Sequence, residues 1–353
     1  MLSHAEKFAE KISETYKSEV SDKVFGYDLF SKLVNLCRNE IIKTLSVNHK
    51  SLFEKLPIVV VTAPDVDATL MPVPEHEKEF IMVVSVRYFL SLHLILNANI
   101  WAALNSGLTD QKTLSEMSNM LCQLFAYRFI KRPLDRLPQY STSSPVDKDS
   151  GLASDIIYKF AIVCFVIGHE FAHLLSQQGD QGINTLTNEL NSFRLDIPNQ
   201  SQKQELVADL FGAHLMRDTM KHFLINNSAD SNLGIVGSIP FVVVSYLSAM
   251  CYLMTLCEMA AKKMRVDSVK GQLSPGQLEQ LKFYDELSNY PVGDLRFESL
   301  MKGFGKELSN IAVQFADFSK KFWINSLYNA SNEDMSVLNK CIGLLSVFNE
   351  EIS

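Results

Sequence analysis

The sequence is poor in cysteine, and its cysteines form no pattern. Six are scattered along 353 residues without a CxxC pair, and most have apolar neighbours. Secreted disulfide-rich domains and redox motifs place their cysteines at close, regular spacings. We therefore expect reduced thiols, as in a cytosolic protein, and no disulfide framework.

A block of like charge is also missing. The chain has 33 basic and 40 acidic side chains and a formal net charge of −7. Proteins that bind nucleic acid through phosphate contacts cluster their lysines and arginines, so we expect no nucleic-acid partner. With 47% hydrophobic and 21% charged residues the composition is that of a folded globular chain, not of a disordered one.

The N-terminal stretch "MLSHAEKFAEKISETYKSEV" lacks the apolar core of a signal peptide or an anchor, because charges occur throughout it. We therefore expect a cytoplasmic protein. One segment, residues 231–257, has no charged residue and is long enough to span a bilayer. It contains Gly, Pro, Ser and Asn, which favours a buried core helix, and a membrane span is the alternative.

Helical and strand-like patterns follow one another along the chain. Apolar residues recur at helical spacing over residues 3–48 and predict two amphipathic helices. Runs of β-branched residues broken by Pro and Asp occupy residues 56–90, the only strong strand signal. Ser154 stands where an N-cap belongs and predicts a helix over 154–177, and a further helix is expected over 200–223.

These patterns predict an α+β fold that is predominantly helical, with one small sheet. We divide the chain into an N-terminal helical region, a core that carries a helical and loop insertion, and a C-terminal helical region. The predicted bounds are 1–55, 56–265 with the insertion at about 100–153, and 266–353. The insertion ends in a stretch rich in Pro, Ser and Asp, which is typical of an exposed loop.

Two histidines and a glutamate interrupt the apolar stretch "CFVIGHEFAHLL". Burying such groups is costly unless each finds a partner, and one bound metal ion would serve all three. In this HExxH pattern the four-residue spacing puts His169 and His173 on one helical face, one turn apart, where both can bind a zinc ion. Glu170 is placed to take a proton from water at the metal's open position. The alternative is a buried helix whose polar residues bond to neighbours.

A zinc site needs a third protein ligand. The metzincin pattern HExxHxxGxxH requires glycine at Ser176 and histidine at Gly179, so it fails. The gluzincin pattern uses a glutamate on a following helix, commonly within ExxxD, and "QELVADLFGAHL" supplies Glu205 and Asp209. Glu205 completes a His₂Glu site, and Asp209 can accept a hydrogen bond from the remaining ring N–H of one ligand histidine.

At these residues the chain resembles the gluzincin clan of zinc metallopeptidases, in the branch with HExxH…ExxAD. The resemblance implies a zincin-like core, a zinc cofactor and a protein or peptide substrate. It also implies that an edge strand over 68–71 pairs with extended substrate, an ordinary small sheet being the alternative. "SNYPVGDLRFESL" is similar to a His-Pro…Arg element of the clan, which makes Arg296 and Tyr290 candidate donors to the oxyanion. A loop tyrosine and a salt-bridged arginine are the alternatives.

The chain departs from the clan by an insertion of about sixty residues before the motif helix and by the 32 positions from His173 to Glu205. Phage-exclusion proteases of the Lit type are one cytosolic group that it resembles. The sequence favours a zinc endopeptidase with Glu170 as general base. A non-catalytic metal-binding regulatory or interaction protein and a membrane-integrated metallopeptidase are the alternatives. Glu170 argues against a purely structural site, which would use four protein ligands.

Overall fold

The computed structural model describes residues 3–17, 27–62, 68–86, 148–227, 291 and 293–304. Most of these residues are helical, and a small three-stranded mixed sheet accompanies them, so the α+β class is confirmed. Residues 100–147 of the predicted insertion, the segment 231–257 and Tyr290 lie outside the described residues.

The chain forms two compact units. The first comprises 1–93, 148–194 and 206–243, and the second comprises 94–147, 195–205 and 244–353. The boundary after Glu205 falls inside one continuous helix. The sheet and the motif helix belong to the first unit.

The two helices predicted near the N-terminus are present as α1 (His4–Lys17) and α3 (Tyr27–Thr44). Ser3 and Glu6 form a reciprocal capping box at the start of α1. The Ser3 Oγ accepts from the Glu6 N–H at 3.1 Å, and the Glu6 carboxylate accepts from the Ser3 N–H at 2.7 Å. This cap fixes where the helix begins.

A third N-terminal helix, α4 (Val47–Glu54), was not predicted. Eight residues give too short a window for a helical period to stand out. Its local signal is Ser46, the N-cap, whose side chain accepts from the His49 N–H.

The strands are β1 (Ile58–Val61), β2 (Ala68–Val73) and β3 (His76–Ser85), in the order β1-β3-β2. β1 runs parallel to β3, and β2 pairs antiparallel with β3 through a tight hairpin that holds Glu75 at a φ of 66°. The strand signal over 56–90 is thus confirmed. In the described part of the sheet β2 is an edge strand.

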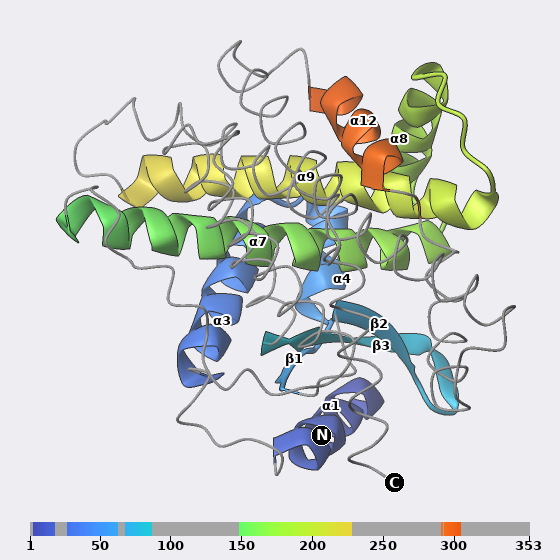
Figure 1. The fold of residues 1–353 in the computed structure, drawn as a ribbon. Coiled ribbons are helices and arrows are strands. Elements are labelled where there is room, and N and C mark those ends of the chain that lie inside the picture. The colour runs from blue at the N-terminus through green and yellow to red at the C-terminus, as the bar shows by residue number, and fades with distance from the viewer. Residues whose placement is uncertain are drawn as a thin grey trace, which may run out of the picture. The chain divides into compact units, whose positions relative to one another are not determined.

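The two faces of the sheet are covered by different helices. α1 lies on one face, where it packs on alternate strand residues. This cluster comprises Ala5, Val59, Val61, Val73, Ile81 and Val83, with Phe8, Ala9, Ile12, Tyr16 and Met71 against it. The intervening residues Met82 and Val84 are also buried, and the motif helix α7 packs on β2. Figure 1 shows α1 and α7 on opposite sides of the sheet.

The motif helix α7 spans Lys148–Gln177. The predicted end at residue 177 is confirmed, but the predicted start was wrong, because the helix begins six residues before Ser154. A serine can cap a helix only at its first turn, and Ser154 lies inside a helix that has already begun. Once a helix has formed, each further residue adds a backbone hydrogen bond at small cost, so the helix continues through the polar stretch.

Within the described residues, Lys159–Gln177 of α7 is the one helical segment long and apolar enough to cross a membrane. The protein itself buries 83% of its 18-residue window. Such burial by other parts of the same protein is typical of the core helix of a folded domain.

Two further helices follow α7. α8 (Gln181–Ser192) was not predicted, and α9 (Gln200–Asn227) confirms the helix expected over 200–223. The last described helix along the chain is α12 (Gly293–Phe304), which lies in the second unit.

Two buried cysteines lie between helices of the first unit. Cys37 on α3 and Cys164 on α7 are free thiols, as the sequence analysis expects of those positions. The Cys37 Sγ donates to the Phe160 carbonyl at 3.6 Å, and burial raises the pKa of the Cys37 thiol. Both residues therefore act as small apolar groups that join α3 to α7.

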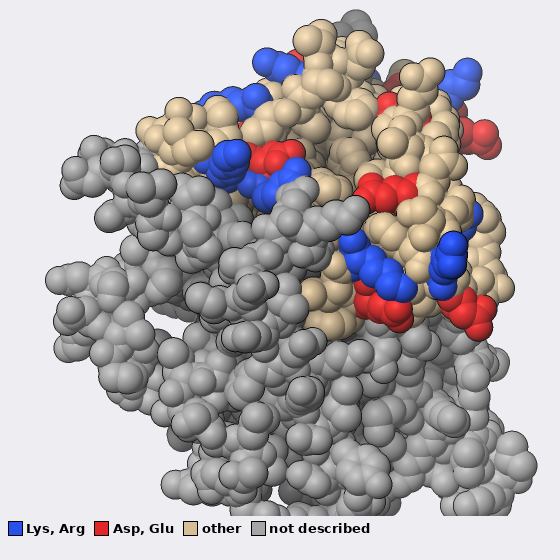
Figure 2. Space-filling view, turned by 90° about the horizontal axis from the view of Figure 1, so that it is seen from above, with Lys and Arg blue, Asp and Glu red and all other residues tan. Residues whose placement is uncertain are grey.

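Charges of both signs are mixed on the surface that Figure 2 shows, which is Figure 1 seen from above. Over the described residues of this face, lysines and arginines alternate with aspartates and glutamates, and no continuous patch of one sign forms. The absence of a nucleic-acid partner stays a prediction.

α7 and α9 approach each other closely at two glycines. A Cβ on Gly212 would lie 2.8 Å from the Phe165 carbonyl oxygen and 2.9 Å from the His169 nitrogen. A Cβ on Gly168 would lie 3.0 Å from the Gly212 Cα. The atoms in the way belong to backbone, which cannot turn aside as a side chain can. The two helices can therefore hold this separation only with glycine at the crossing.

Substitution of Gly212 by alanine tests this crossing. In a free helix alanine is favoured over glycine by about 1 kcal/mol, so propensity alone predicts a more stable protein. The blocked Cβ must instead push α7 away from α9, and overpacking of this kind costs about 1–3 kcal/mol. We expect a lower free energy of unfolding in denaturant titrations of Gly212→Ala. An equal or higher value would show that the crossing does not need glycine.

Candidate metal centre

Three metal-ligating side chains meet where α7 and α9 cross. His169 and His173 come from α7 and Glu205 comes from α9, and their ligand atoms all lie within 4.8 Å of one another. The sequence predicts this group, and the structure brings its three members together. Glu205 stands one turn before Asp209 on the continuous helix α9, so the crossing that positions Asp209 also positions Glu205.

The two histidines have the separation that a shared zinc ion requires. The Nε2 atoms of His169 and His173 are 3.2 Å apart, and their rings meet at 80°. Two nitrogens at about 2.0–2.1 Å from a tetrahedral zinc ion are about 3.3–3.4 Å apart. The ring nitrogens therefore need only a small adjustment to bind the same ion. Without metal, one ring can donate to the other across this gap.

Asp209 fixes the orientation of His169. Its side chain is 0% exposed, and Oδ1 lies 3.0 Å from the Nδ1 of His169. A carboxylate can only accept, so the proton must be on Nδ1, which leaves the Nε2 lone pair for a metal. Carboxylates commonly hold zinc-binding histidines in this way. The predicted contact of Asp209 with one ligand histidine is thus present, and the histidine is His169.

Glu170 lies beside the ligand group without belonging to it. It is 8% exposed and follows His169 directly on α7. Successive residues of a helix point about 100° apart, so Glu170 is turned away from the face that His169 and His173 share. Its carboxylate is not one of the three ligand atoms that come together.

The structure does not test the two predicted oxyanion donors. Arg296 is 6% exposed on α12, a helix of the second compact unit. Tyr290 lies outside the described residues. Their role stays a prediction.

Asp180, the acidic residue nearest to the failed metzincin position, has a structural task. Its Oδ1 accepts from the N–H groups of Gly182 and Ile183 and so caps α8. Its Oδ2 lies 2.8 Å from the Nε2 of His49. Burial is the largest single influence and would raise the pKa of this carboxyl, but His49 and the N–H groups of Ile183 and Gly182 together outweigh it, so the pKa is lowered. Asp180 therefore joins α4 to α8 and contributes no ligand to the metal group.

Sequence reasoning missed the glycines that make the site. Ala208, the small residue within the ExxAD pattern, is buried on α9. The positions at which an added Cβ would meet the backbone of the other helix are Gly168 and Gly212. A glycine inside a helical pattern often marks close packing. Gly168 and Gly212 lie in the two helices that carry the metal-ligand patterns, so they were the sequence signal for the close approach of these helices.

No family model, no curated protein and no solved structure matches this chain. The case for the metal centre therefore rests on the spacing of its residues and on their geometry.

Removal of Asp209 tests whether the site binds zinc as arranged. We expect Asp209→Ala to weaken zinc affinity by about ten- to a hundredfold, because His169 loses the group that fixes its tautomer. Competition with a chromophoric chelator measures this affinity. Asp218→Ala is the matched control, since Asp218 lies exposed on the same helix. Equal affinities in the two variants would contradict the assigned role.

Proposed function

We propose that this chain is a zinc-dependent endopeptidase of the gluzincin type, with zinc held by His169, His173 and Glu205. The observation that carries the proposal is the convergence of these three ligand atoms within 4.8 Å. Three protein ligands leave a tetrahedral ion one open position, as in catalytic zinc sites, whereas structural sites use four. Zinc, when bound, supplies the Lewis acidity that polarises a peptide carbonyl and makes water a better nucleophile.

Glu170 is the general base in this proposal. It accepts a proton from the attacking water and returns it to the amine that leaves when the peptide bond breaks. Its place next to His169 and outside the ligand group supports this assignment. Asp209 takes no part in proton transfer and holds His169 in position through Nδ1.

The sheet supports a peptide as substrate. β2 is the edge strand beside β3 among the described strands, and α7 packs on it. The outer side of an edge strand presents unpaired backbone N–H and C=O groups, to which an extended peptide can add as a further strand. An antiparallel edge strand next to the motif helix is also the arrangement that a zincin-like core requires. Residues 68–71, the segment expected to pair with substrate, lie in β2.

A non-catalytic metal-binding protein is the competing proposal. It would retain the ligand group and Asp209 but would give Glu170 no chemical task. A membrane-integrated peptidase would depend on residues 231–257, outside the described residues. The cytoplasmic location stays a prediction.

Substitution of Glu170 by glutamine separates catalysis from metal binding. Glutamine keeps the shape of the side chain but cannot take up the proton, so we expect unchanged zinc content and at least about a hundredfold slower cleavage. Cleavage is followed by mass spectrometry on a mixed peptide library, with elemental analysis of the same samples.

Glu189→Gln on α8 is the matched control, and it should retain activity. Full activity in Glu170→Gln with normal zinc would reject Glu170 as the base. Normal zinc in the wild type without zinc-dependent cleavage of any peptide would instead favour the non-catalytic alternative.

A further inference from the structure

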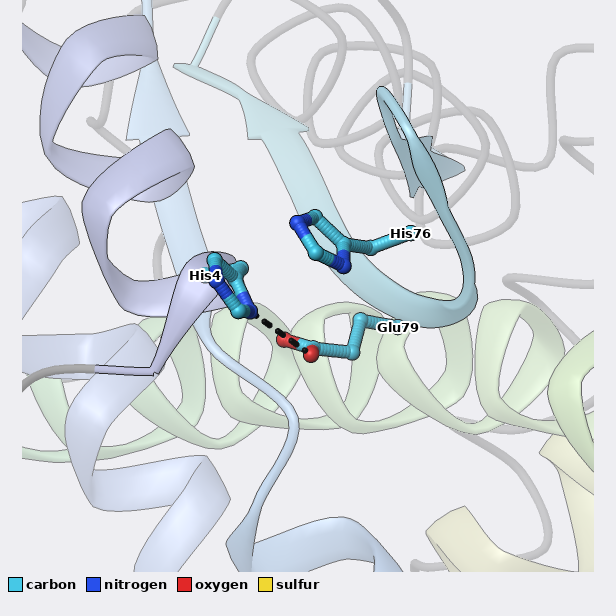
Figure 3. A group of neighbouring side chains, drawn as sticks. All are labelled: His4, His76 and Glu79. Atoms are coloured by element: carbon cyan, nitrogen blue, oxygen red, sulfur yellow. Dashed lines mark hydrogen bonds and ion pairs between the residues drawn. The ribbon is translucent and has the colours of Figure 1, made fainter.

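A second group of metal-ligating side chains lies on the α1 side of the sheet. His4 is the first residue of α1, and His76 and Glu79 belong to β3. One ligand atom from each lies within 4.8 Å of the other two. Figure 3 shows the two imidazoles and the carboxylate turned toward one another. None of the three residues belongs to the group around His169.

An irregularity in the hairpin makes this grouping possible. His76 and Glu79 are three residues apart, and in a regular strand they would point to opposite faces. The pairing of β2 with β3 shifts between Pro72 and Val73, so that Pro72 pairs with Phe80 and Val73 pairs with His76. Such a bulge re-aims the side chains next to it. The side chains of His76 and Glu79 thereby reach His4 at the start of α1.

The carboxylate of Glu79 is held in place by α1. Its Oε2 accepts from the Ala5 N–H at 2.9 Å, and its Oε1 lies 3.3 Å from the Nδ1 of His4. The hydrogen bond from Ala5 is the main cause that lowers the pKa of the Glu79 carboxyl, so the group is ionised at neutral pH. One oxygen thus anchors the side chain while the other faces the imidazoles.

The two imidazoles are close enough to share an ion. Their ring centroids are 3.6 Å apart and their planes differ by 15°. In such a stack the nitrogen lone pairs run nearly parallel, so one ring must tilt for both to point at one ion. The side chain of His4 is 56% exposed and has room to turn. Two imidazoles and a carboxylate suit zinc, cobalt, nickel or copper rather than magnesium or calcium.

We propose that His4, His76 and Glu79 form a second, surface site for a divalent transition-metal ion, which fastens the start of α1 to the β2–β3 hairpin. The ion joins residues more than seventy positions apart in the sequence. It thereby holds α1 over the apolar cluster that α1 forms with the sheet. This site does not depend on the proposed peptidase activity.

Zinc titration of tag-free protein tests the second site, with calorimetry as the readout. The His173→Ala variant serves as background, because it lacks one ligand of the site on α7 and α9. We expect this background to bind zinc through the surface group. Addition of His76→Ala or Glu79→Gln should weaken this binding by more than about tenfold, since a three-residue site loses one of its ligands.

Glu77→Gln is the matched control, because Glu77 is an exposed carboxylate two residues away on the same strand. It should leave the binding unchanged. Zinc affinity that is the same with and without His76→Ala would overturn the proposal, as would a His173→Ala background that takes up no zinc.

Hydrogen exchange tests the link between α1 and the hairpin. In the His173→Ala background, zinc should slow amide exchange over residues 4–17, because the bound ion opposes opening of α1. The effect should vanish on addition of His76→Ala. Zinc binding without any change of exchange in α1 would contradict the fastening role.

Discussion

The close crossing of α7 and α9 is the constraint on which the metal centre depends. Gly168 and Gly212 let the two backbones come so near that Gly212 has no room for a Cβ and one at Gly168 would be tightly placed. His169 follows Gly168 directly, and Asp209 lies about one turn before Gly212. The crossing therefore sets the contact between His169 and Asp209, and with it the reach of Glu205 on the same helix.

This crossing also explains how an apolar helix tolerates two histidines. A buried polar group is costly only while it lacks a partner. His169 has Asp209 on one ring nitrogen and His173 near the other. The same partners that make burial tolerable fix the tautomer that a metal needs. The contact with Asp209 therefore both compensates the burial of His169 and prepares its Nε2 to bind a metal.

Local spacing determined what the sequence could predict. The pairing of His169 with His173 follows from the helical repeat, Glu205 and Asp209 follow from the gluzincin pattern, and the α+β class follows from the apolar periods. The start of α7 was misplaced because a capping preference is weaker than the continuation of a formed helix. The group of His4, His76 and Glu79 could not be predicted, because it depends on contacts between distant segments. Gly168 and Gly212 are a sequence signal for close packing, but the partner that each of them meets is set by a contact between distant segments. The role of Arg296 and Tyr290 as oxyanion donors stays a prediction, and Tyr290 lies outside the described residues.

Zinc K-edge X-ray absorption on protein loaded with one equivalent of zinc tests the central claim most directly. The His76→Ala variant is the right sample, because it removes the competing surface group. The account predicts four nitrogen or oxygen neighbours at about 2.0–2.1 Å, with the scattering pattern of two imidazoles. Sulfur ligands, a spectrum without imidazole or zinc that is lost on gel filtration would contradict it.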